Sequence, residues 1–501
     1  MDETVLRAEH WWSRLAGRTQ GSRSESDVVE SWRIAGGDNA WTVSVALPNP
    51  LAATFVRWFG RRLVLWPDGI PAKRITSICS SSIGKRKDRQ PEWFDALRTA
   101  VLRLDFATEC LTHVLSTATA DGVRRCCDLF GVERLDVMIG TAEPISLSEL
   151  SRWIDRTVTD ADEPHDRCMV RRAILSPPVV GTAGQGIEPA GQIPSDLLAD
   201  SLLAAVGHRI VALKVRKGGR VDRILQRCLD DPDLTAPVLL ADHRNVRQRD
   251  HMQHLVEAGA VRWLLEYDET QSGDRTATAS GDGPSDDDGF CNREGFDRED
   301  VPTVPHGVLA EPEQWLSHWT RAHPGAWPDQ DDDEFWDELI LGCRTSDRSA
   351  FATLLKILQD RRLNAAGAGQ GTRCVSFTAV PLAEFRQRRI FRRHKQQFDF
   401  ELYGIAVRRD VLSARGAKPV VYTDRESPLT AKDDDVFLRQ PATNAAGTID
   451  WTAEQEWRFV GDLPLDEFAV DELVVFVSNE VEVERVRRVV DWPVVCVPRA
   501  G

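Results

Sequence analysis

The feature that most limits the folds open to this chain is an alternation of short β-branched runs with amphipathic stretches between residues 60 and 265. The apolar runs have the length and composition of buried strands and cover residues 62–66, 74–79, 110–115, 134–139, 171–175, 209–215, 236–241 and 261–265. The stretches between them carry apolar residues at helical spacing, over 93–104, 120–131, 194–207, 220–231 and 249–260. Strands that alternate with helices predict a mostly parallel, doubly wound, Rossmann-like α/β sheet covered on both faces.

The chain of 501 residues is long enough for more than one domain. Residues 266–300 hold twelve acidic residues, three basic residues and five glycines, a composition that predicts a solvated linker. We expect limited proteolysis to cut first between residues 266 and 305 and to release two stable fragments. We therefore predict an N-terminal extension, a Rossmann-like nucleotide-binding domain, an acidic linker and an α+β domain, over 1–60, 61–265, 266–311 and 312–501.

The part of the chain after the linker has a mixed pattern. A Trp-rich passage that contains Trp315, Trp319, Trp327 and Trp336 is expected to be helical, as are 351–363, 380–395 and 480–490. Strands are expected at 373–378, 400–407, 419–422, 456–460, 472–477 and 493–497. This order predicts a compact α+β fold.

Charge and cysteine usage exclude several classes of protein. The net charge of −15 argues against electrostatic binding of nucleic acid by the chain as a whole. The ten cysteines form no CxxC pair, so neither a zinc ribbon nor a disulfide framework is indicated, and the histidines suggest no metal site. No apolar run is long enough to span a membrane or to serve as a signal peptide, and we expect a cytoplasmic protein.

Three loops are candidates for binding an anion, because ligands of parallel sheets bind outside the carboxyl ends of the strands. They follow the strands predicted at 74–79, 110–115 and 209–215. The side chains and turns that we expect to contact a nucleotide are Ser81, Ser82, Gly84 and Arg86, then Thr117 and Thr119, then Lys217, Gly218 and Gly219. Taken singly, each loop is equally compatible with an ordinary helix cap or turn.

Residues 60–265 lack both GxGxxG after a strand and GxxxxGK[ST]. The order of a strand, a Ser-rich loop with Lys and Arg, the WFDALR helix, a further strand and the TATADGVRR helix resembles the Rossmann-like superfamily that includes DprA and the LOG proteins. That resemblance implies nucleotide binding. The LOG proteins' Gly- and Thr-rich phosphate turn, with its catalytic Arg and Glu, is not recognisable here, which favours nucleotide sensing over phosphoribohydrolase chemistry.

Residues 350–498 resemble abortive-infection and other bacterial defence proteins, through an SFT strand, a YGI strand, a PVVY strand and the segment WTAEQEWRF. The same elements are similar to an ADP-ribosyltransferase layout with NAD as cofactor. The resemblance implies that Arg373 contacts the NAD phosphate and that Ser376 and Thr378 wall the pocket. It also implies that Glu456 is the catalytic carboxylate and that Glu454 orients the acceptor.

These residues also have a purely structural interpretation. Ser376 and Thr378 share one strand face, and Glu454 and Glu456 ahead of Arg458 can form ordinary ion pairs. The basic run RQRRIFRRHK at 386–395 is either a solvated helix face or a contact for nucleic acid, a protein partner or NAD phosphate.

Two hypotheses follow. In the first, the protein is a cytoplasmic sensor–effector, of the kind used in anti-phage defence, with a nucleotide-binding front half and an ADP-ribosyltransferase-like second half. In the second, both halves are non-catalytic modules, and residues 386–395 dock a protein or nucleic acid.

Overall fold

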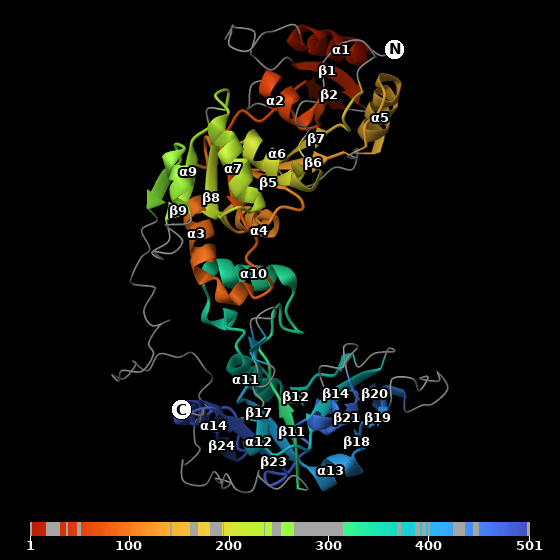
Figure 1. Cartoon of the computed structure of the whole chain (residues 1–501), viewed down its shortest axis with the longest axis vertical. Coiled ribbons are helices and arrows are strands. Elements are labelled where there is room, and N and C mark those ends of the chain that lie inside the picture. The colour runs from red at the N-terminus through yellow and green to blue at the C-terminus, as the bar shows by residue number, and fades with distance from the viewer. Residues whose placement is uncertain are drawn as a thin grey trace. The chain divides into compact units, whose positions relative to one another are not determined.

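The computed structural model of the chain divides into two compact units, one made of residues 1–278 and 328–346 and the other of residues 279–327 and 347–501 (Figure 1). The segment 328–346, which sequence analysis assigned to the C-terminal domain, thus belongs to the first unit. The structure describes residues 3–16, 31–36, 39–47, 52–140, 143–160, 169–180, 193, 195–234, 236–242, 252–264, 314–367, 372–385, 391–392, 397–398, 401–423, 436–443 and 450–497. The predicted linker at 266–311 lies outside these residues.

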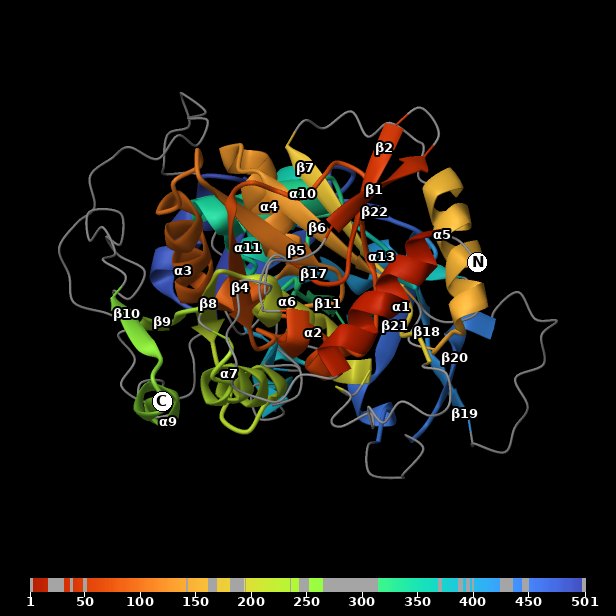
Figure 2. The same cartoon turned by 90° about the horizontal axis from the view of Figure 1, so that it is seen from above.

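The first unit is built on a sheet with the order β1-β2-β3-β7-β6-β5-β4-β8-β9-β10 (Figure 2). From β7 to β10 all neighbouring strands are parallel, which confirms the predicted mostly parallel Rossmann-like sheet. The parallel strands are β4 (Arg74–Ser80), β5 (Glu109–Val114), β6 (Arg134–Ile139), β7 (Val170–Leu175), β8 (Arg209–Lys214), β9 (Val238–Asp242) and β10 (Val261–Leu264).

The N-terminal residues extend this sheet with antiparallel strands. A hairpin of β1 (Ser31–Gly36) and β2 (Asn39–Ser44) pairs with β3 (Val64–Trp66), which in turn pairs with β7. Trp12, Trp41 and Trp58 from this region are almost fully buried. The N-terminal extension is therefore part of the first unit's core.

Helices with one apolar face cover the sheet of the first unit. They are α1 (Glu3–Ala16), α2 (Ala52–Phe59), α3 (Pro91–Leu102), α4 (Ala120–Phe130), α5 (Leu147–Asp160), α6 (Leu198–Val206), α7 (Arg220–Asp230) and α9 (Gln253–Glu257). A further helix of this unit, α10 (Asp332–Leu341), packs on α3 and α4. The helix expected at 249–260 is present as α9 and ends at Glu257, three residues before the predicted end, while residues 249–251 lie outside the described part of the chain. Helix α6 packs on β4 and β5, whereas α3 contacts α4, β8 and α10.

The second unit has a mostly antiparallel sheet in the order β18-β21-β14-β11-β17-β23-β24, with β13 beside β14. Its members are β11 (Trp315–Trp319), β13 (Ala366–Gly367), β14 (Arg373–Thr378), β17 (Gly404–Arg408), β18 (Lys418–Pro419), β21 (Glu456–Val460), β23 (Leu473–Val477) and β24 (Val494–Cys496). Short pairs outside it join β12 (Arg362–Leu363) to β22 (Leu463–Pro464) and β19 (Val421–Thr423) to β20 (Arg439–Pro441).

Helices α11 (Ala350–Asp360), α13 (Arg409–Ala414) and α14 (Glu480–Arg487) complete the second unit. One buried apolar cluster joins Leu354 and Leu358 of α11 and Val483 and Val486 of α14 to the strand residues Val375, Ile405 and Val475. The α+β class that sequence analysis predicted for this region is confirmed.

Two of the predicted helices are wrong over part of their length, although Trp336 of the Trp-rich passage does lie on a helix, α10. Trp315 and Trp319 lie on strand β11 in the interior of the sheet, between β14 and β17. The helix predicted at 380–395 includes α12 (Leu382–Phe385) but does not reach residue 395 as one helix, because Phe391–Arg392 forms strand β15 and pairs with β16 (Gln397–Phe398). In β11, pairing with strands distant in sequence outweighs the local helical pattern, whereas β15 pairs with a strand only a few residues away.

Candidate functional site

The parallel sheet reverses its strand order between β4 and β8. From β4 the chain adds β5, β6 and β7 on one side, and from β8 it adds β9 and β10 on the other. In open α/β sheets such a reversal leaves a crevice outside the carboxyl ends of the two central strands, and ligands bind there. Two of the three predicted loops follow β4 and β8, and the third follows β5, the neighbour of β4.

The loop after β4 is hydrogen-bonded to the loop after β8. The backbone N–H of Ser81 donates to the carbonyl of Lys214 (2.7 Å), and the Ser81 hydroxyl oxygen accepts from the backbone N–H of Arg216 (3.0 Å). Ser80 is buried and accepts a hydrogen bond from the indole of Trp93 in α3 (2.8 Å). These bonds define where the two loops lie relative to each other.

The remaining predicted residues of the β4 loop differ in their accessibility. Ser82 is exposed and its hydroxyl oxygen accepts from Gly84, which has a positive φ of 82°. Arg86, expected to contact phosphate, is instead buried, with 4% of its surface exposed, and its Nε donates to Asp88 (2.8 Å). In this structure the guanidinium of Arg86 is engaged by a carboxylate of its own loop.

In the loop after β5, the threonine hydroxyls donate hydrogen bonds to backbone carbonyls of the first unit. Thr119 is buried and donates to the carbonyl of Ile78 in β4 (2.8 Å), while Thr117 donates to the carbonyl of Val114 (2.8 Å). Between them and the strand lie the exposed side chain of Leu115 and Ser116, whose φ is 71°. The Thr119 bond ties this loop to β4, so the three predicted loops converge.

The loop after β8 is a glycine turn with a carboxylate support. Gly218 has a φ of 72°, and its backbone N–H donates to the carboxylate of Asp222 in α7 (2.7 Å). The other oxygen of Asp222 lies 2.7 Å from Nε2 of His254. A Cβ on Gly219 would meet the carbonyl oxygen of Arg216 at 2.9 Å, so this position also favours glycine.

Exposed cations surround the converging loops. Lys85, Arg216 and Lys217 are exposed, and the Lys214 amine donates to the side chain of Gln90 (2.9 Å). Burial, followed by the charge of Arg216, lowers the pKa of Lys214. Arg216, Asp222 and His254 were not predicted to contribute to this site. The spacing of four residues from Gly218 to Asp222 could have indicated that Asp222, in the first turn of α7, accepts a hydrogen bond from the glycine turn.

In the second unit, the predicted residues Ser376 and Glu456 are in contact. The Ser376 hydroxyl donates to the Glu456 carboxylate (2.7 Å), and strand pairing sets Thr378 opposite Glu456. Glu456 also accepts two hydrogen bonds of 2.9 Å from Arg458, which is 7% exposed and further donates to Gln440 and to the carbonyl of Phe437. Burial lowers the pKa of Arg458, but the hydrogen bond and charge of Glu456 outweigh it and raise that pKa.

The other predicted residues of this region make backbone contacts. Arg373 donates from Nε and a terminal nitrogen to the carbonyl of Ala365 (3.1 and 2.8 Å). The Thr378 hydroxyl donates to the carbonyl of Glu454 and accepts from the N–H of Val380. Glu454 ends a short 3-10 helix, and Gln455 after it has a φ of 45°. Within the basic run, residues 386–390 and 393–395 lie outside the described part of the chain.

Two features are absent among the residues that the structure describes. They include no helix long and apolar enough to cross a membrane, and no cluster of His, Cys, Asp and Glu side chains suited to a metal ion.

Taken together, the strand order and the loop geometry define an α/β protein with a Rossmann-like first unit and a candidate ligand edge at its β4–β8 reversal. No family model and no curated protein matches the sequence. Among solved structures, the chain is similar to DNA processing protein A (DprA) from Streptococcus pneumoniae, with a TM-score of 0.24 and 11% identity over 40% of this chain and 62% of that one. It is also similar to the molybdenum cofactor carrier protein from Chlamydomonas reinhardtii, with a TM-score of 0.18 and 12% identity over 38% and 88%.

At these TM-scores, neither similarity bears on function. The Rossmann-like character of the first unit rests on its own strand order and parallel register.

Proposed function

We propose that the first unit binds an anionic nucleotide or nucleotide-derived ligand at the carboxyl ends of β4 and β8. The observation that carries this proposal is the hydrogen bond between Ser81 and Arg216, which joins two loops where the strand order reverses. The positive charge that phosphate groups require is supplied by exposed cations of the same loops, Lys85, Arg216 and Lys217.

The chemistry of the loops fits such a ligand. The turn at Gly218 and Gly219 leads directly into α7, whose first N–H groups and dipole favour an anion. The exposed Leu115 at the end of β5 offers an apolar contact of the kind that a base needs. A nucleotide combines both requirements in one molecule.

The test is binding of ATP, ADP and NAD, measured by calorimetry on the full chain and on two matched variants. Lys217→Ala removes a cation at the proposed site and should weaken binding by about 1.5–3 kcal/mol, as for a charge-assisted hydrogen bond. Arg74→Ala removes an exposed cation at the opposite, amino end of β4 and should leave affinity unchanged. A ligand at 100 times its Kd should add about 2.7 kcal/mol to stability, and no stabilisation by any nucleotide would refute the proposal.

The second unit has a second candidate function, an NAD-dependent ADP-ribosyltransferase-like activity with Glu456 as its catalytic carboxylate. It is favoured by the Ser376–Glu456 hydrogen bond, which joins two residues that the resemblance assigns to one pocket. The structural alternative is that Glu456 serves Arg458 alone, in which case both units are binding modules. If Glu456 is catalytic, the protein couples a nucleotide sensor in its first unit to an effector in its second.

These alternatives separate in an assay of NAD turnover with Glu456→Gln. A carboxylate needed in the transition state should reduce the rate by orders of magnitude in the variant. Because Glu456 also holds Arg458, the variant must be shown to be folded by its circular dichroism spectrum before its rate is interpreted. Turnover equal to that of the wild type, or none in the wild type, would rule out a catalytic Glu456.

A further inference from the structure

Helix α10 is part of the first unit although the chain on either side of it belongs to the second. Strand β11 precedes it and helix α11 follows it, and both are in the second unit. The helix has its own termini: the Asp331 side chain and Glu334 form a capping box, and Gly342, with a φ of 71°, ends it. This segment is therefore a discrete helix of the first unit that is supplied by the C-terminal part of the chain.

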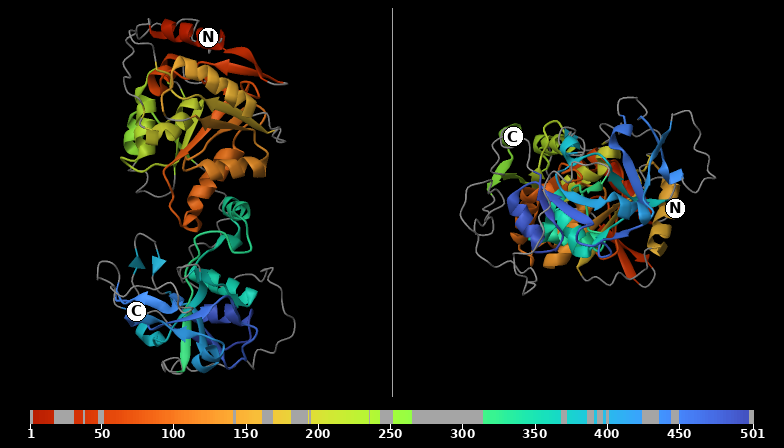
Figure 3. Two further views of the ribbon diagram at one scale, coloured as in Figure 1. Left: turned by 90° about the vertical axis from the view of Figure 1, so that its right-hand side faces the viewer. Right: turned by 90° about the horizontal axis from the view of Figure 1, so that it is seen from below.

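The apolar face of α10 packs on α3 and α4, and the views in Figures 1 and 3 agree on this arrangement. Phe335, Trp336, Leu339 and Ile340 are all buried. The Trp336 ring lies 5.7 Å from that of Phe94, centroid to centroid, and the amine of Lys87 lies 4.2 Å from its ring. A Cβ on Gly122 of α4 would lie 3.3 Å from Trp336, so glycine there permits the close approach.

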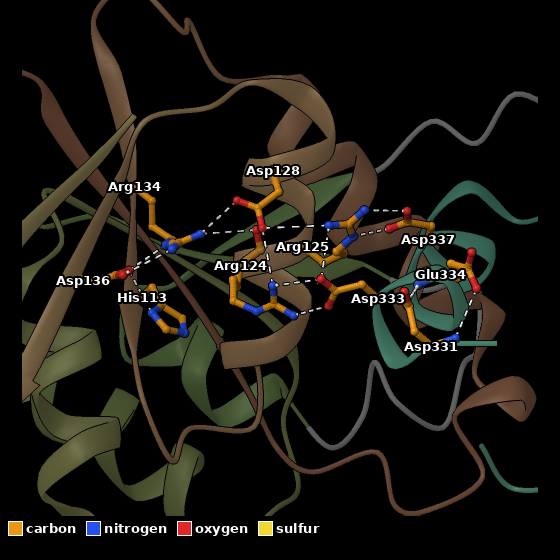
Figure 4. Close-up of polar contacts among 10 residues, drawn as sticks. All are labelled: His113, Arg124, Arg125, Asp128, Arg134, Asp136, Asp331, Asp333, Glu334 and Asp337. Atoms are coloured by element: carbon orange, nitrogen blue, oxygen red, sulfur yellow. Dashed lines mark hydrogen bonds and ion pairs between the residues drawn. The ribbon is translucent and has the colours of Figure 1, made fainter. Parts of the chain in front are cut away.

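The polar face of α10 carries charges opposite to those of α4 (Figure 4). Arg125 donates to both oxygens of Asp337, one of these bonds being 2.6 Å long, and Arg124 pairs with Asp333. Arg98 of α3 donates to the carbonyl of Ile340 (2.7 Å) at the other end of the helix. The hydrogen bond and charge of Asp337 raise the pKa of Arg125.

The network continues into the sheet beneath. Asp128 accepts from Arg124 and from Arg134, whose guanidinium also donates to Asp136, and Asp136 lies 2.9 Å from Nδ1 of His113 (Figure 4). The arginines that meet α10 are thus oriented by groups of the first unit itself. A prearranged cationic surface of this kind fits an acidic helix with large apolar anchors.

We propose that the α3–α4 surface is a docking site for the acidic, aromatic helix 328–346 of this chain, and that this helix keeps the C-terminal part of the chain bound to the N-terminal part when the polypeptide between them is cut. The composition of the predicted linker leads us to expect that cleavage in 266–305 releases two stable fragments. The docking of α10 changes that expectation, because the C-terminal fragment carries the helix that completes the fold of the N-terminal one.

The experiment uses the full chain with a protease recognition sequence inserted after Gly289. After complete cleavage, the two fragments should elute together in gel filtration at 0.15 M salt. At micromolar concentration in 1 M salt they should dissociate more readily, because screening weakens the ion pairs while the apolar contacts remain. Separation of the wild-type fragments at 0.15 M salt would overturn the proposal.

Variants identify α10 as the element responsible. Trp336→Ala should raise the Kd of the fragments at least 100-fold, and co-elution unchanged by it would overturn the assignment. Arg125→Asp should raise the Kd about tenfold, and adding Asp337→Arg should restore most of the affinity, a result that misfolding cannot produce. If the double variant binds no better than Arg125→Asp alone, a direct ion pair between residues 125 and 337 is refuted. Lys356→Ala, in an exposed pair with Asp360 of the second unit, is the control and should change nothing.

Discussion

The hydroxyl oxygen of Ser81 accepts a hydrogen bond of 3.0 Å from the backbone N–H of Arg216, across the point where the strand order of the parallel sheet reverses. Together with the bond from the Ser81 N–H to Lys214, it joins the loops after β4 and β8. The candidate ligand edge therefore depends on local hydrogen bonds that single substitutions can remove.

Ser81→Ala removes the hydrogen bond between the Ser81 hydroxyl and Arg216 but keeps the backbone bond to Lys214. We expect a loss of about 0.5–1.5 kcal/mol in the free energy of unfolding, as for an ordinary hydrogen bond, and weaker nucleotide binding because the loops are no longer held together. Urea unfolding and calorimetry measure the two effects. Ser82→Ala, at an exposed position, should leave stability within about 0.5 kcal/mol of the wild type.

Gly218→Ala tests the left-handed turn before α7. Nothing lies within 4 Å of a Cβ at this position, so the cost comes from the φ of 72° alone. We expect a loss of about 1–2 kcal/mol in unfolding free energy. Gly218→Asn should cost less, because Asn tolerates this conformation, and equal losses for both variants in urea unfolding would contradict the backbone explanation.

Glu456→Gln should destabilise the second unit whatever its effect on activity. Arg458 is almost buried, and the variant replaces its carboxylate partner by a neutral amide, at a cost of about 1.5–3 kcal/mol. Glu484→Gln in the exposed pair with Arg487 is the matched control, with an expected loss of about 0–1 kcal/mol. Similar urea midpoints for the two variants would show that Glu456 does not support Arg458.

His208 should make the stability of the first unit depend on pH. Its Nδ1 accepts a hydrogen bond from the N–H of Ile75, and burial followed by the charge of Arg74 lowers its pKa from the ordinary 6.5. The unfolded chain therefore binds the proton first as pH falls below about 6.5, and the stabilisation present above that pH is lost. His208→Asn keeps an acceptor but does not titrate, so its thermal midpoint should fall less between pH 7.5 and 5.5 than that of the wild type.

The first unit shows what periodicity can predict. The strand at 134–139 is found at the predicted residues, and the others agree to within a few residues, because buried parallel strands require continuous apolar runs. Their parallel order also places the ends of β4, β5 and β8 at one edge. The convergence of the loops was therefore predictable, but the engagement of Arg86 by Asp88 and of Thr119 by Ile78 was not.

The second unit shows where periodicity is ambiguous. Trp315 and Trp319 are four residues apart, a spacing that places both on one face of a helix and also on one face of a strand. This segment forms a strand and not a helix because it pairs with β14 and β17, which lie far along the chain. By contrast, β15 and β16 are close in sequence, and they pair antiparallel where the local pattern favoured a helix.

The apolar runs and the helical stretches between them thus determined by themselves the class of each unit and the edge at which a ligand is expected, since these follow from local period and from parallel order. The tertiary structure alone decided which surfaces meet. The sequence around Trp336 predicts a helix, but an amphipathic pattern specifies only that a face must be buried. That this face packs on α3 and α4, with Arg124 and Arg125 opposite Asp333 and Asp337, depends on the complementary shape and charge of residues about 200 positions away.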